Sequence, residues 1–157
     1  MYRKILVPLD GSKLAECVLP HVEALAKGCQ AQEVVLARVH EPFRGFTGSA
    51  DVVLTEREIT RIDSEQIAAA QKYLKEAVNR VHLDGVKSRA ELLKGSVAES
   101  LAEYAAKNGV DLIVIATHGR SGVSRWVWGS IADRILRTSC VPVLMVRAPG
   151  CVPGVQG

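Results

Sequence analysis

Short apolar segments alternate with amphipathic segments along this chain, and the alternation constrains the fold more than any other feature of the sequence. The apolar segments, each typical of a buried strand, occupy residues 4–9, 33–40, 86–93, 111–116 and 141–147. Apolar residues recur at helical spacing between them, over residues 13–27, 55–84, 96–108 and 130–138. Because strands that alternate with helices form a parallel sheet with right-handed crossovers, the pattern predicts an α/β fold. We expect three layers, a five-stranded parallel sheet with helices on both faces.

The composition fits one domain with an aliphatic core. The chain has 157 residues, of which 48% are hydrophobic and only 4% aromatic. A core of Val, Ile, Leu and Ala suits a parallel sheet that is buried on both faces. We therefore predict a single domain over residues 1–147. Residues 148–157 hold two prolines and three glycines and are predicted to form a flexible tail.

Charge and cysteine content argue against several classes of protein. A net charge of +3 is too small to predict nucleic acid as the main partner. The four cysteines form no C-x-x-C pair and fit no zinc module, so we expect reduced thiols in a reducing compartment. The apolar run from Ile5 to Leu9 is too short for a signal peptide, and no run is long enough to span a membrane. These observations predict a cytoplasmic protein.

Short local signals place the ends of the helices. Two capping boxes, Thr55-x-x-Glu58 and Ser96-x-x-Glu99, mark helix starts. Pro20 lies inside the first helical pattern and predicts either a kink or a restart of that helix.

One long segment has no periodicity. Residues 41–54 contain glycines and follow the second strand, at the edge of the sheet where the other strands also end. We therefore predict a mobile loop that covers a ligand site as a flap.

Two strand exits carry unusual chemistry. Ligands of open α/β sheets bind beyond the carboxyl ends of strands, where the winding reverses. The first exit is Pro8-Leu9-Asp10-Gly11-Ser12, and the second is the segment 116–122, followed by Gly129-Ser130 at a helix start. Glycines let a phosphate approach the backbone, and a helix start offers N–H groups with a partial positive charge. These exits predict a phosphate-binding site, although the same residues also suit plain turns, with Asp10 capping the first helix.

Three motifs follow one another in a specific order. They are V-P-L-D-G-S after the first strand, T-H-G-R-S-G after the fourth, and G-S-I-A-D-R-I-L-R-T-S-C-V-P-V-L-M-V near the end. Together they resemble the universal stress protein family over about residues 2–147. The resemblance implies an adenine-nucleotide α-hydrolase-like fold with strand order 3-2-1-4-5. Nucleotide-binding members carry G-x2-G-x9-G-[ST]; here Gly119 and Gly129-Ser130 match its second half, and Ala116 stands at its first glycine.

By this resemblance the chain binds an adenine nucleotide, ATP or the related AMP or ADP. Pro8, Asp10 and Val39 would line the adenosine pocket, and the glycine-rich segment would hold the phosphates. Two roles of Asp10 stay open, accepting from a ribose hydroxyl or helping to hold Mg²⁺. The residues expected to contact the nucleotide are Pro8, Leu9, Asp10, Val39, Ala116, Thr117, His118, Gly119, Arg120, Gly122, Gly129, Ser130 and Ile131.

The function implied by the resemblance is a stress-response regulator that acts through nucleotide-dependent conformation or partner binding. Slow ATP hydrolysis or autophosphorylation stays open, because no residue has the setting of a catalytic base and no G-x-x-x-x-G-K-[ST] motif is present. Ala116 supports an alternative, a nucleotide-free homodimeric adaptor of the same fold.

The fifth strand, residues 141–147, predicts a homodimer. In the implied strand order it lies at an edge of the sheet, and its residues are apolar up to Arg147. The opposite edge strand is protected by Lys87, Arg89 and Glu91. An apolar edge is most simply covered by the same strand of a second copy, antiparallel across a two-fold axis.

Overall fold

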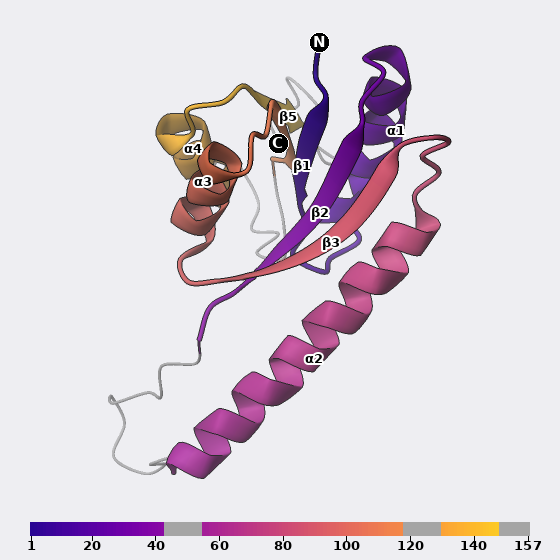
Figure 1. The fold of residues 1–157 in the computed structure, drawn as a ribbon. Helices are drawn as coiled ribbons and strands as arrows, with labels where there is room; N and C mark the ends of the chain where they lie inside the picture. Colours follow the sequence, from indigo (N-terminus) through magenta and orange to yellow (C-terminus); the bar gives the residue numbers. More distant parts are fainter. Residues whose placement is uncertain (43–54, 118–129, 148–157) are drawn as a thin grey trace, which may run out of the picture.

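The computed structural model describes residues 1–42, 55–117 and 130–147, and Figure 1 shows their arrangement. The strands are β1 (Lys4–Pro8), β2 (Glu33–His40), β3 (Lys87–Lys94), β4 (Leu112–Ala116) and β5 (Val143–Val146). The helices are α1 (Leu19–Gly28), α2 (Glu56–Arg80), α3 (Val97–Lys107) and α4 (Ser130–Thr138), with a short 3-10 helix η1 (Ala15–Val18) before α1. The predicted flap, from residue 43 onward, and the predicted tail over 148–157 lie outside the described residues.

The strands form one parallel sheet in the order β3-β2-β1-β4-β5. This is the order that the resemblance implies, and the predicted fold class is confirmed. β1 is central, because the chain builds first outward through β2 and β3 and then on the other side through β4 and β5. The sheet is therefore doubly wound, and the direction of winding reverses between β1 and β4.

Helices cover both faces of the sheet, as the sequence predicts. Because side chains alternate along a strand, Ile5 faces one side of the sheet and Leu6 faces the other. On the first side, α1 and α2 contribute Val22 and Leu74 to the core. On the second side, α3 and α4 pack together and contribute residues such as Leu101. Figure 1 shows α3 and α4 to the left of the strands, α1 at the upper right, and α2 running diagonally below the sheet.

The first helical segment is divided at the position that Pro20 predicts. The 3-10 helix η1 ends at Val18, and α1 begins at Leu19 with Pro20 in its first turn. A proline fits there because the first N–H groups of a helix have no partner within the helix. Of the two alternatives, restart and kink, the structure shows the restart.

The two predicted capping boxes have different outcomes. Thr55 accepts from the Glu58 backbone N–H, and the Glu58 carboxylate accepts from the Thr55 N–H at 2.8 Å, so the first box is complete. Ser96 is the N-cap of α3, but its hydroxyl donates to the Glu99 carboxylate and caps no backbone N–H. The prediction of a second complete box is wrong, because Arg134 of α4 also binds the Glu99 carboxylate and draws it into the α3–α4 contact.

α2 ends before the predicted position near residue 84. Its last residue is Arg80, and Val81 is extended with φ −79° and ψ 127°. Val81 is buried in the core beside α1, and the His82 N–H donates to the Glu23 carboxylate of α1 at 2.9 Å. Contacts with α1 therefore end the helix, and a periodic pattern contains no such information. β2 has its predicted bounds, and each of the other strands differs from its predicted bounds by one or two residues at one or both ends. None of the described helices, α2 included, is both long and apolar enough to cross a membrane.

Candidate functional site

β1 and β4 lie side by side for only a short distance. Their register pairs Ile5 with Leu112 and Leu6 with Ile113, whereas β1 remains in register with β2 as far as Pro8 opposite Ala37. Beyond Leu6 the two strands therefore separate. This is the place where the winding reverses, which is where open α/β sheets hold their ligands.

Pro8 gives a chemical reason for the separation. The Leu9 N–H donates to the Ala37 carbonyl at 2.8 Å, so the backbone of Leu9 faces β2. Because backbone groups alternate in direction along a strand, the residue before it faces β4. Pro8 has no N–H to donate there, so the pairing of β1 with β4 cannot continue through it.

The turn after β1 sets the position of Asp10. Gly11 has φ 88°, a conformation that favours glycine, and it reverses the chain. The Asp10 carboxylate accepts from the Ser12 N–H at 2.8 Å and from the Ser12 hydroxyl at 2.6 Å. The Ser12 hydroxyl in turn accepts from the Ala15 N–H at 3.1 Å. Ser12 thus bonds the start of η1, and Asp10 stabilises the turn that precedes it.

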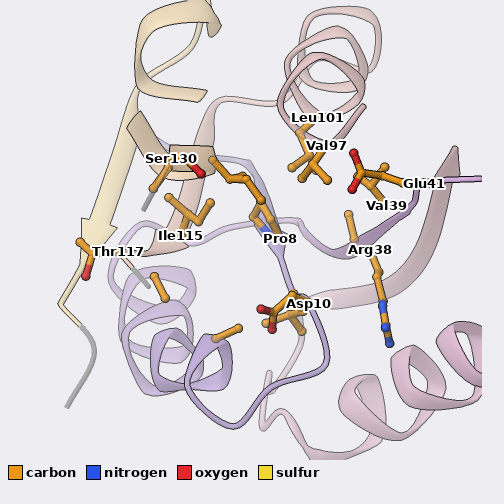
Figure 2. A pocket seen from close by; sticks show the side chains of 16 residues that line it. Pro8, Asp10, Arg38, Val39, Glu41, Val97, Leu101, Ile115, Thr117 and Ser130 are labelled. Carbon is orange, nitrogen blue, oxygen red and sulfur yellow. The ribbon is translucent and has the colours of Figure 1, made fainter. Parts of the chain in front are cut away.

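A cavity of about 340 Å³ opens where the strands separate, within the size range of small-molecule sites. Figure 2 shows Pro8 between Ser130 on one side and Val39 on the other, with Val97 and Leu101 across from Asp10. The residues that line the cavity are Pro8, Leu9, Asp10, Ala15, Ala37, Arg38, Val39, Glu41, Val97, Leu101, Ile115, Ala116, Thr117, Ser130, Ile131 and Ala132.

Residues that the sequence analysis selected from three distant parts of the chain meet on the wall of this cavity. They are Pro8, Leu9, Asp10, Val39, Ala116, Thr117, Ser130 and Ile131. The other selected residues, His118, Gly119, Arg120, Gly122 and Gly129, lie outside the described residues. The described part of the wall therefore joins the ends of β1, β2 and β4 to the start of α4.

One end of the cavity is an apolar slot between β2 and α3. Val39 forms one side, and Val97 and Leu101 of α3 form the other. The N–H and C=O groups of Val39 point to the β1 side of β2, as those of Ala37 do, because backbone groups alternate along a strand. Ala37 is opposite Pro8, the last residue of β1, so Val39 has no residue of β1 opposite it. Its N–H and C=O therefore face the cavity as an adjacent donor and acceptor.

The opposite end of the cavity is the start of α4. Ser130 is the first residue of this helix, and Ser130 and Ile131 line the wall. The N–H groups at a helix start carry a partial positive charge and attract anions. Arg134, one turn further on, binds Glu99 in the first turn of α3. This ion pair links the helix of the apolar slot to the helix of the anion-attracting end.

Arg38 is a cavity residue that the sequence analysis did not select. Its guanidinium lies over the ring of Tyr73 on α2, 5.6 Å from the ring centre. The Tyr73 hydroxyl donates to the Glu16 carboxylate at 2.9 Å, and Arg80 donates to the same oxygen at 2.6 Å. Burial, reinforced by the bond to Glu16, raises the pKa of Tyr73 well above its usual value. The phenol therefore remains protonated and keeps its place beneath Arg38.

Other wall residues also escaped selection, for an understandable reason. Val97 and Leu101 look like ordinary core positions of an amphipathic helix, and Glu41 follows a strand without a motif around it. A single charged residue at position 38, within the otherwise apolar centre of a buried strand, was the one signal that could have drawn attention to Arg38.

Ala116 lies on the wall, but its side chain belongs to the packed interior. It is 7% exposed and belongs to the core cluster on the α1 side of the sheet. The next residue, Thr117, donates its N–H to the Val146 carbonyl at 2.8 Å, which fixes the end of β4 to β5. The Ala116 methyl group thus contributes to packing at the place where the family pattern has a glycine.

The carboxylates of the wall bear on metal binding. Within residues 1–42, 55–117 and 130–147, no three His, Cys, Asp or Glu side chains gather as a metal site would require. Asp10 and Glu41 are the carboxylates among the described wall residues. Mg²⁺ that arrives with substrate phosphates needs only one or two protein carboxylates. The residues present therefore fit Mg²⁺ only as the companion of a bound nucleotide.

Comparison with known proteins places the chain in a family. Residues 1–147 match the model of the universal stress protein family. The universal stress protein MJ0531 of Methanocaldococcus jannaschii is 31% identical to this chain, over 95% of this chain and 84% of its own length. The solved structure of MJ0577, from the same organism, is 28% identical with a TM-score of 0.73, over 96% of this chain and 99% of that one.

Two more distant solved structures contain nucleotides. One is a universal stress protein in complex with cAMP, 21% identical with a TM-score of 0.67, over 94% of this chain and 98% of that one. The other is a universal stress protein family protein of Arabidopsis thaliana with AMP bound, 13% identical with a TM-score of 0.64, over 94% and 92%. At these identities the likeness concerns the fold. With the family model matching over residues 1–147, the chain belongs to the universal stress protein family.

Proposed function

We propose that the cavity binds an adenine nucleotide, ATP or the related AMP or ADP, and that the protein regulates a stress response through nucleotide-dependent conformation or partner binding. One observation carries the proposal. A single cavity is lined by an apolar slot, a fixed carboxylate and the start of a helix, at the point where the winding reverses. These parts match the base, the sugar and the phosphates of a nucleotide.

The slot suits an adenine ring. Val97 and Leu101 offer apolar surface on one side, and the neighbouring N–H and C=O of Val39 lie on the other. Adenine presents an acceptor, N1, beside a donor, the N6 amino group. A base that extends the line of β1 would pair with the backbone of Val39 through these two groups. The nucleotides bound by two relatives of this fold, cAMP and AMP, both contain adenine.

The other residues of the cavity wall suggest positions for the sugar and the phosphates. The sugar would lie beside Asp10, and the phosphates would reach Ser130 and the N–H groups of the first turn of α4. Asp10 would either accept from a ribose hydroxyl or hold Mg²⁺ that accompanies the phosphates.

The nucleotide itself is the direct test. The protein is purified, denatured and analysed by mass spectrometry for a released nucleotide, and the affinities for ATP, ADP, AMP and GTP are measured by calorimetry. We expect an adenine nucleotide and a clear preference for adenine over guanine. If no nucleotide co-purifies and none of the four binds, the nucleotide proposal fails and the adaptor alternative, which Ala116 supports, takes its place.

We also propose that two copies associate through β5. β5 is an edge strand of the sheet, and Leu144 in its centre is 38% exposed. A second copy, antiparallel across a two-fold axis, would cover this apolar edge. Light scattering should show a dimer that Leu144→Lys dissociates, because like charges would meet at the axis. Ser88→Lys on β3, the opposite edge, is the matched control. A wild-type monomer would refute the dimer, and a dimeric Leu144→Lys variant would refute this interface.

A further inference from the structure

The wall beside Asp10 contains a charge that the proposed nucleotide site has not yet used. Among the described residues that line the cavity, Arg38 is the single Lys or Arg. Figure 2 shows Arg38 and Asp10 extending to one side of Pro8, whereas Val97, Leu101 and Ser130 lie to the other. A cation and an anion therefore lie on the same side of Pro8 along the cavity wall.

Arg38 is held in place by its neighbours. The guanidinium carbon of Arg38 lies over the Tyr73 ring, 5.6 Å from the ring centre, and Tyr73 is itself anchored through its hydroxyl to Glu16. Arg80 of α2 donates to the same Glu16 carboxylate, so the chain of contacts from the cavity runs through α2 to η1. Stacking engages the face of a guanidinium, whereas its N–H donors lie in its plane and point outward. The contact with Tyr73 limits the positions that the Arg38 guanidinium can take.

The two charged groups have complementary hydrogen-bonding capacity. The carboxylate of Asp10 only accepts, and the guanidinium of Arg38 only donates. A ribose presents two neighbouring hydroxyls, each of which can donate and accept. One acceptor and one fixed donor can thus bond both hydroxyls at once.

We propose that Arg38, positioned by Tyr73, donates to a ribose hydroxyl oxygen while Asp10 accepts from the other hydroxyl, so that the site selects ribonucleotides over deoxyribonucleotides. The inference rests on the proposed nucleotide site and names a specificity-determining residue within it. The competing explanation is that Arg38 only covers the seam between β2 and α2.

Affinities for modified sugars separate the two explanations. ATP, 2′-deoxy-ATP and 3′-deoxy-ATP are titrated calorimetrically into the wild-type protein and into Arg38→Gln. A hydrogen bond to a charged group corresponds to about 10-fold or more in affinity. We expect the wild type to prefer ATP over one or both analogues by at least about that factor, and Arg38→Gln to lose most of this preference for at least one analogue.

Matched variants test the positioning by Tyr73. Tyr73→Phe keeps the ring and should keep the preference, whereas Tyr73→Leu removes the stacking surface and should reduce it. Thermal denaturation of each variant verifies that it is folded before titration. Arg61→Gln removes the same charge from α2, where the side chain is 75% exposed, and should leave the preference unchanged.

Failure of the inference is distinguishable from failure of the proposed function. If ATP binds the wild type and Arg38→Gln discriminates against both deoxy analogues as strongly as the wild type does, the role of Arg38 is refuted while the nucleotide site stands. An equal loss of preference in Arg61→Gln would show a general effect of charge and would also refute it. If the wild type binds neither ATP, ADP nor AMP, both proposals fall together.

Discussion

β1 and β4 are fastened together at one end of the sheet and separate at the other. At the amino end, the Asp111 carboxylate accepts from the backbone N–H groups of Arg3 and Lys4 at 2.9 and 2.8 Å, and the Asp111 N–H donates to the Lys4 carbonyl at 2.9 Å. At the carboxyl end, register stops after Leu6, and Pro8 has no N–H to extend it. The cavity therefore results from two local features of the same pair of strands. Asp111 holds the strands together at one end, and Pro8 prevents their pairing at the other.

The charged side chains at the two ends also have different partners. At the closed end, Lys4 binds Glu33 at 3.0 Å, and Lys87 and Arg89 lie near the same carboxylate. At the open end, Asp10 and Arg38 border a cavity. Changes at the closed end should therefore affect the free energy of unfolding, and changes at the open end should affect ligand affinity.

The clearest test of this division is Asp111→Ala. It removes a carboxylate that accepts two backbone hydrogen bonds, so the free energy of unfolding should fall by about 3 kcal/mol. Asp111→Asn keeps one oxygen acceptor and should lose less. Urea denaturation gives the stabilities, and calorimetry under native conditions should give unchanged ATP affinity for the folded variants. An Asp111→Ala variant as stable as the wild type would show that this carboxylate does not hold the closed end.

The matching change at the open end is Ser130→Ala. Loss of a hydrogen bond to a charged phosphate should weaken ATP by about 10- to 150-fold. The free energy of unfolding without ligand should barely change, because Ser130 is exposed at the start of α4. Ser64→Ala, on the exposed part of α2, is the control and should bind normally. Unaltered affinity in Ser130→Ala would remove the start of α4 from the proposed site.

Ala116→Gly tests a residue that belongs to both the packed core and the cavity wall. Its methyl group packs in the core on the α1 side, so its loss should lower the free energy of unfolding by about 1 kcal/mol. Nucleotide affinity should not rise. Tighter ATP binding by this variant would contradict this expectation. It would mean that the Ala116 methyl group crowds the ligand at a position where the family pattern has a glycine.

The smallest expected effect concerns pH at the closed end. A hydrogen bond from Lys4, with the nearby charges of Lys4, Arg89 and Lys87, lowers the pKa of Glu33 in the folded protein. A lowered pKa contributes stability that is fully present above the unfolded value, about 4.3, and is lost as pH falls through the folded value. Urea denaturation from pH 7 downward should therefore show a steeper loss in the wild type than in Glu33→Gln. Parallel curves would mean that this ion pair does not contribute.

Much of the fold was predictable because its causes are local. The alternation of apolar and amphipathic segments predicted every described strand and helix, and Pro20 marked the restart of the first helix. The family motifs implied the strand order that the structure shows. The errors have tertiary causes. α2 ends at Arg80 because Val81 is buried beside α1, and Ser96 forms no complete box because Arg134 engages Glu99.

The sequence by itself determined the two strand exits, since a proline without an N–H, a glycine turn and a helix start act through their nearest neighbours along the chain. It also determined that the central strands are buried on both faces, because their residues are apolar without alternation. Only the tertiary structure decided that Val97 and Leu101 face Val39, and that Arg38 stacks on Tyr73 beside Asp10. These contacts depend on which helix covers which strand end, and no spacing along the chain encodes the meeting of residues so far apart.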